Sequence, residues 1–85
     1  MQSFTYVVKD RAGIHARPAG LLVKTMQGFE CPVTITCHGK TIDGKKLFAL
    51  MAMAVRCGDA VTLTTDGVDE EEAMASAREF ITANL

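Results

Sequence analysis

A histidine and an arginine stand two residues apart in the segment Gly13-Ile14-His15-Ala16-Arg17-Pro18, at the expected start of a helix. Pro18 has a fixed φ and no N–H, so it suits a first helical turn. The first N–H groups of a helix lack partners and carry partial positive charge. A phosphoryl group on His15 would therefore meet the N–H groups of Ala16 and Arg17 and the Arg17 guanidinium. Because these positive surroundings disfavour imidazolium, we expect a neutral ring that attacks phosphorus near pH 7.

A histidine near a helix start is by itself more often a surface or capping residue. Its neighbours here make phosphoryl chemistry specific, because residues 13–19 resemble the active-centre segment of the HPr family. These proteins are histidine-containing phosphocarriers of the bacterial phosphoenolpyruvate-dependent sugar phosphotransferase system. The similarity extends over essentially the whole chain, through residues 33–40, 46–48 and 61–70.

The pattern of elements predicts an α+β fold. Strand and helix periodicities alternate in the order strand, helix, two strands, helix, strand, helix, which favours helices packed on one face of a mainly antiparallel sheet. The expected ranges are strands at 4–8, 33–37, 40–42 and 61–64, and helices at 16–27, 47–55 and from Asp69 onward. Asp69 is expected to cap the last helix, with Glu72 completing a capping box. The resemblance implies the open-faced βαββαβα sandwich, with four antiparallel strands and three helices on one face, as one domain over 1–85.

The resemblance also implies a role. His15 would accept a phosphoryl group on Nδ1 from phosphoenzyme I and pass it to the IIA components of sugar permeases. Arg17 would be the charge partner, and the first-turn amides, that of Ala16 included, would bind the phosphate. On this interpretation the protein is a carrier and not an enzyme, and it needs no cofactor and no metal.

Partner proteins would dock beside His15. One face of the first helix and the short, largely apolar second helix are the docking surface that the resemblance implies, and Met51 would suit a surface that adapts to several partners. The expected docking residues are Gly20, Lys24, Gln27, Leu47, Phe48 and Met51. From the sequence alone, Lys24 can equally be a solvated charge, and the apolar residues of the second helix can equally be core.

Lys46 departs from the family pattern. Many members carry a serine there, which a kinase phosphorylates in low-GC Gram-positive bacteria to make a co-repressor, and lysine cannot accept that group. We therefore predict that the serine switch is lost. An alternative function follows: an HPr-like regulatory binding module whose docking is controlled by phosphorylation of His15.

Length, net charge and hydrophobicity limit the classes of protein to which this chain can belong. Eighty-five residues suffice for a modest core but not for a deep catalytic cavity beside it. A net charge of −1 gives no attraction to nucleic acid. No apolar run is long enough to span a bilayer, and no signal sequence is evident. We expect a cytoplasmic protein, bound neither to nucleic acid nor within a membrane, and most simply a monomer.

The three cysteines predict no disulfide framework. Cys31, Cys37 and Cys57 are odd in number and form no CxxC pair, so we expect small core residues in a reducing compartment. His38 follows Cys37, but neighbouring residues of a strand point to opposite faces. We therefore expect no metal site there.

Overall fold

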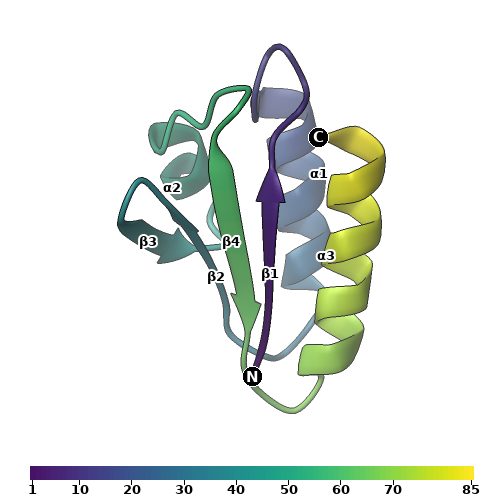
Figure 1. Cartoon of the computed structure of the whole chain (residues 1–85). Coiled ribbons are helices and arrows are strands. Elements are labelled where there is room, and N and C mark those ends of the chain that lie inside the picture. The colour runs from purple at the N-terminus through teal and green to yellow at the C-terminus, as the bar shows by residue number, and fades with distance from the viewer.

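The structure, a computed structural model, describes residues 1–85. It is a four-stranded antiparallel sheet with strand order β1-β4-β2-β3. The helices lie on one side of the sheet (Figure 1). The elements are β1 (Gln2–Val7), α1 (Ala16–Gln27), β2 (Val33–Cys37), β3 (Lys40–Asp43), α2 (Leu47–Ala52), β4 (Ala60–Thr65) and α3 (Glu70–Asn84). The predicted α+β fold is confirmed.

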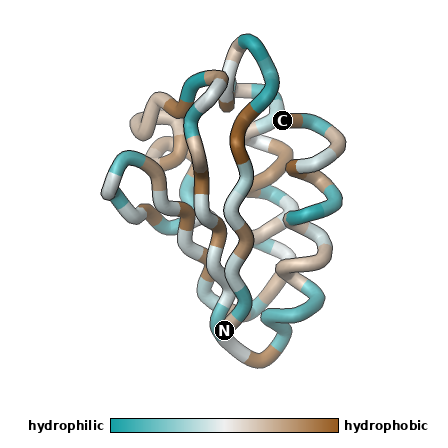
Figure 2. The backbone as a smooth tube through the Cα atoms, in the orientation of Figure 1, coloured by the Kyte–Doolittle hydropathy of each residue, from teal (hydrophilic) through white to brown (hydrophobic).

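Period-two alternation in the strands decides which face of the sheet is buried. In β4, Val61 and Leu63 are buried while Thr62 and Thr64 are partly exposed. The open face carries hydroxyls, and the side chains of Thr5 and Thr62 bond across the strands at 2.9 Å. Figure 2 shows this alternation as brown and pale bands along the strands. Burying one face this way fixes the register, because a shift of one residue would expose the apolar set.

The helices cover the apolar face with stripes at helical spacing. The buried residues of α1 include Ala19, Leu22, Val23 and Met26. In α3, Ala73, Met74, Ala77 and Ile81 are buried. Phe80 of α3 is only half-buried against the core.

The second helix is shorter than its apolar run predicts. It ends at Ala52, not at Val55, because Ala54 has a φ of 51° that cannot continue a right-handed helix. Hydrophobicity continues through Val55, which is buried in the core without being helical. The run therefore marks burial and not helix length.

The predicted capping box at the start of α3 is wrong. Asp69 is the N-cap residue, but its carboxylate makes no bond to the helix. It instead accepts the backbone N–H groups of Glu30 and Cys31, both at 2.9 Å. These bonds, that from the Glu30 N–H first, hold the pKa of Asp69 below its usual range. Asp69 thus fastens the segment between α1 and β2 to the start of α3.

Gly13 allows the loop before α1 to meet the segment after α2. Its φ is +66°, and an added Cβ would lie 2.2 Å from the Val55 oxygen and 2.8 Å from the Arg56 Cα. Both atoms belong to backbone and cannot turn aside. The next residue, Ile14, donates its N–H to the same Val55 oxygen at 3.1 Å.

We predict that Gly13→Ala lowers the free energy of unfolding by about 2–4 kcal/mol, because it adds backbone strain to a steric clash. Gly20→Ala is the matched control: Gly20 lies within α1 with nothing within 4 Å of an added Cβ. That change should be neutral or stabilise by up to about 1 kcal/mol. Urea unfolding measures both, and equal effects of the two substitutions would contradict this account of Gly13.

Candidate functional site

His15 is the N-cap residue of α1. Its backbone is extended, with φ −101° and ψ 176°, and its side chain makes no capping hydrogen bond. Its carbonyl accepts the N–H of Ala19 at 3.0 Å, which closes the first turn of the helix. With 46% of the side chain exposed, the imidazole is open to another molecule while its backbone is fixed.

The first turn of α1 offers unpaired donors beside this imidazole. The N–H groups of Ala16 and Arg17 have no acceptor within the protein, and Pro18 has no N–H. The Arg17 side chain is exposed and forms no ion pair. Two amides, a helix dipole and a free guanidinium are together suited to hold an anion next to His15.

Asp10 belongs to this site, and sequence reasoning missed it. Its Oδ2 lies 3.8 Å from Nε2 of His15, while its Oδ1 accepts the N–H of Ala12 at 2.9 Å. A carboxylate on the Nε2 side favours the tautomer with the proton on that nitrogen, which leaves a lone pair on Nδ1. The only feature of the sequence that pointed to Asp10 was its position in the loop before α1. That position does not reveal how close its carboxylate lies to His15.

The site lies in a shallow depression of about 320 Å³. It is lined by Asp10, His15, Arg17, Pro18, Leu21 and Asn84. Asn84 belongs to the end of α3. That end lies beside the loop before α1, because the N–H groups of Lys9 and Asp10 donate to the Leu85 oxygen at 2.7 and 2.9 Å. Figure 1 shows the end of α3 close to the loop that leads into α1. The end of α3 and the Val55 carbonyl, which accepts the Ile14 N–H, thus both hold the loop that carries Asp10.

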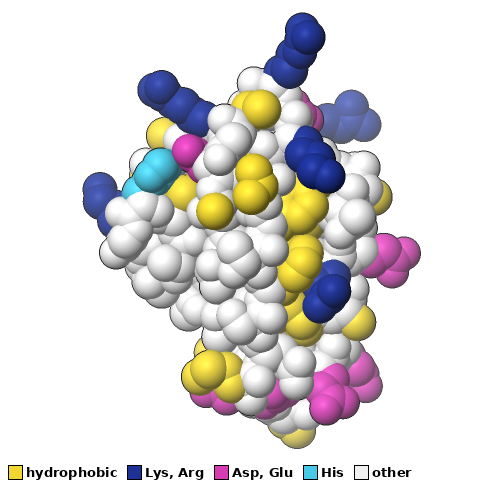
Figure 3. Space-filling model, in the orientation of Figure 1, with side chains coloured by type: hydrophobic (Ala, Val, Ile, Leu, Met, Phe, Trp, Pro, Cys, Tyr) yellow, Lys and Arg dark blue, Asp and Glu magenta, His cyan; other side chains and the backbone are white.

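Charge is unevenly distributed along the molecule. Figure 3 shows basic side chains around the end where the β1–α1 loop lies, and acidic ones at the opposite end. The acidic end includes Glu70, Glu71 and Glu72 in the first turn of α3. The basic end is therefore the one at which an anionic group would be favoured.

The expected docking residues of α1 differ in their exposure and in their contacts with the rest of the chain. Lys24 and Gln27 are exposed and Gly20 is half-buried. Gln27 Nε2 donates to the carbonyl of Lys45 at 2.9 Å, so this side chain also holds α1 to the start of α2. A partner that bonded Gln27 would compete with that contact.

The expected apolar residues of α2 divide between core and surface. Phe48 is 87% exposed, whereas Leu47 and Met51 are half-buried against the core. An aromatic ring held out on a helix is a large apolar area for a partner to cover. Only Phe48 of the three is free of the core.

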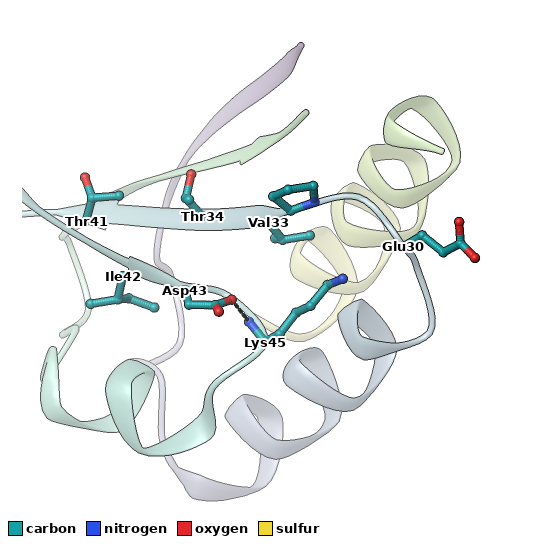
Figure 4. Close-up of a pocket in the computed structure, with 8 residues that line it drawn as sticks. Glu30, Val33, Thr34, Thr41, Ile42, Asp43 and Lys45 are labelled. Atoms are coloured by element: carbon teal, nitrogen blue, oxygen red, sulfur yellow. Dashed lines mark hydrogen bonds between the residues drawn. The ribbon is translucent and has the colours of Figure 1, made fainter. Parts of the chain in front are cut away.

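The largest surface depression lies away from His15. It measures about 530 Å³, at the outer edge of the sheet beside β3 (Figure 4). Figure 4 shows Thr34 and Asp43 beside it, with Asp43 accepting the N–H of Lys45 at 2.9 Å. The Lys45 ammonium donates to the carbonyl of Phe29, so the cation beside this depression is already bonded within the chain.

Two expectations about cysteine are wrong. Cys31 and Cys37 are buried, and burial raises the pKa of both thiols, but Cys57 is exposed in the loop before β4. Cys37 and His38 do not point apart either. His38 has a φ of 53°, so it has left the strand, and ligand atoms of Cys37, His38 and Asp59 all lie within 4.8 Å of one another.

A protein-family model described as the phosphorylation site of the phosphotransferase-system HPr component matches residues 2–83. The phosphocarrier protein HPr of Mycoplasma genitalium is 35% identical over 85 residues, which are 99% of this chain and 97% of the relative. The chain belongs to the HPr family. This is a family of phosphocarriers and not of catalytic enzymes.

Solved HPr structures share the fold. A mycoplasma histidine-containing phosphocarrier protein superposes with a TM-score of 0.94 at 30% identity, covering 96% of this chain and 93% of that one. Crh of Bacillus subtilis, solved as a swapped dimer, has a TM-score of 0.77 at 33% identity, with coverages of 92% and 90%. None of the helices combines the length and the hydrophobicity needed to cross a membrane.

Lys46 is the exposed N-cap residue of α2 and makes no side-chain cap. We predict that an HPr kinase with ATP leaves α2 unmodified, because Lys46 has no hydroxyl. Intact mass with peptide mapping measures this, and Lys46→Ser should gain the modification under the same conditions. Failure of Lys46→Ser to gain the modification would contradict this account, and the mapping distinguishes phosphate on α2 from phosphate on Thr41, the nearest hydroxyl residue before the helix.

Proposed function

We propose that this chain accepts a phosphoryl group on His15 from phosphoenzyme I and donates it to IIA components of sugar permeases. The observation that carries the proposal is the half-exposed His15 next to the unpaired amides of Ala16 and Arg17. A capping side chain at His15 would accept the N–H of Arg17, the second residue of the helix, and this imidazole does not. Membership in a phosphocarrier family supports the same role.

The step is a displacement at phosphorus. The Nδ1 lone pair of His15 forms a P–N bond while the phosphoryl group leaves the nitrogen that carried it in enzyme I. Asp10 faces Nε2 and favours the proton there, so Nδ1 is the nucleophile. The charge that spreads over the phosphoryl oxygens is met by the Arg17 guanidinium and the two amides.

The partner supplies what this site lacks. The depression around His15 is shallow and open, so it cannot by itself exclude water or align a donor with an acceptor. We propose that enzyme I and IIA dock over Gly20, Lys24, Gln27, Leu47, Phe48 and Met51. Because one copy presents both His15 and this whole surface, we also propose that the carrier works as a monomer. We further propose that it works in the cytoplasm.

The alternative is a regulatory module of the same fold, in which phosphate on His15 controls docking and is not passed on. The similarity to Crh, described as a catabolite-repression protein, is the observation that favours it. The two functions differ in whether the phosphate leaves His15 for IIA.

We expect intact mass to show one acid-labile phosphate after incubation with phosphoenolpyruvate and enzyme I, and its loss when IIA is added. His15→Ala should abolish charging. Arg17→Ala should keep charging measurable but slow it by about tenfold or more, because one charge partner is lost. Charging without onward transfer would support the regulatory module, and charging of His15→Ala would overturn the proposal.

Phe48→Ala should raise KM for enzyme I by about tenfold, as expected when an aromatic residue at an interface is truncated. Val68→Ala is the control, since Val68 is 85% exposed but stands before α3, at the far end from His15. Neither change empties the core, so unfolding should be unaffected. Equal effects of both variants on KM would exclude Phe48 as a docking residue.

A further inference from the structure

Three side chains with metal-binding atoms converge at one end of the sheet. Cys37 ends β2, His38 follows in the turn to β3, and Asp59 immediately precedes β4. His38 Nε2 and Asp59 Oδ2 are 2.9 Å apart, and one ligand atom from each of the three residues lies within 4.8 Å of the others. None of these atoms belongs to the site around His15.

The fold brings them together through strand pairing. Because β2 and β4 are antiparallel neighbours, with Thr36 opposite Thr62, the end of β2 lies beside the start of β4. His38 and Gly39 both have positive φ, 53° and 74°, which turns the chain sharply and carries the imidazole out of the strand's alternation. Residues other than glycine are uncommon at positive φ, and asparagine, aspartate and histidine are several-fold enriched among those that adopt it.

Asp59 is held in place independently of His38. Its Oδ2 also accepts the N–H of Arg56 at 2.8 Å, its own N–H donates to the Arg56 carbonyl at 3.0 Å, and its carbonyl accepts the N–H of Val8 at 3.0 Å. A carboxylate that is held by the backbone therefore faces the imidazole.

The donor set suits a borderline-soft cation. A thiolate, an imidazole and a carboxylate are the three ligand types of Zn²⁺, and three protein ligands leave the fourth tetrahedral position to solvent. Cys37 is buried, while 59% of the His38 side chain is exposed and gives access. Figure 3 shows a histidine beside an acidic side chain at the surface on the side of the β2–β3 hairpin.

We propose that Cys37, His38 and Asp59 form a site for a divalent transition-metal cation, with Zn²⁺ the best fit. The cation replaces the proton shared by His38 and Asp59 and displaces the proton of the Cys37 thiol, because a coordinating thiol is deprotonated outright. Ligand atoms on a tetrahedral zinc lie about 3.3–3.8 Å apart, given its usual bond lengths. When the cation binds, the 2.9 Å separation between His38 Nε2 and Asp59 Oδ2 must therefore widen, and any ligand atoms nearer the 4.8 Å limit must approach.

The test uses the full chain under reducing conditions, with Zn²⁺ alone by calorimetry and Co²⁺ alone by absorption. We expect one cation per chain and a thiolate-to-cobalt charge-transfer band. Cys37→Ala should remove that band. His38→Asn and Asp59→Asn should each weaken Zn²⁺ binding about tenfold or more. Asparagine tolerates positive φ and retains an oxygen to accept the Arg56 N–H, so both of these variants preserve the local backbone.

Matched controls separate this site from other thiols and imidazoles. Cys31→Ala removes another buried thiol, Cys57→Ser removes the exposed one, and His15→Asn removes the other imidazole. All three should bind Zn²⁺ as the parent does. Absence of saturable binding, or binding lost with Cys57→Ser or His15→Asn but kept by His38→Asn and Asp59→Asn, would overturn the proposal. In that case His38 and Asp59 are an ordinary surface pair above a core cysteine.

Discussion

The close backbone contact between the loop before α1 and the segment after α2 is the constraint on which the site depends. The Val55 oxygen accepts the Ile14 N–H, and the approach leaves no room for a side chain on Gly13. That contact fixes where α1 begins, and so where the imidazole of His15 and the free amides of the first turn point. It also ties the segment that follows α2 to the same loop.

The other segments that contact the His15 site hold its backbone in place and add few reactive groups to it. The Leu85 oxygen accepts the N–H groups of Lys9 and Asp10, which sets the Asp10 carboxylate facing His15. A domain of this size has few residues to spare around one histidine. A helix N-terminus, one guanidinium and one carboxylate form a small, open set of groups around the proposed phosphoryl acceptor. Such a site leaves room for large partner proteins, whereas a deep pocket would prevent their access.

Several side chains have other contacts than their sequence position suggests. Asp69 stands where a helix cap is expected, yet it binds the distant N–H groups of Glu30 and Cys31, because folding brings two strong donors closer than those of its own helix. Cys57 matches the other cysteines in type but lies in an exposed turn. His38 follows a buried strand residue, but positive φ carries it toward Asp59. For Asp69 and His38, the atoms that they contact are far away in sequence.

The sequence by itself determined the elements, the apolar face of each strand and helix, and the segment from Gly13 to Pro18, because periodicity, proline and the helix start act between near neighbours. It also identified the family, through matches along the whole chain. Only the tertiary structure decided that Asp10 faces His15, that Phe48 is exposed while Leu47 and Met51 are half-buried, and that Cys37, His38 and Asp59 meet. These facts depend on which strands pair and which turns adopt positive φ, and no short-range pattern encodes the distance between such segments.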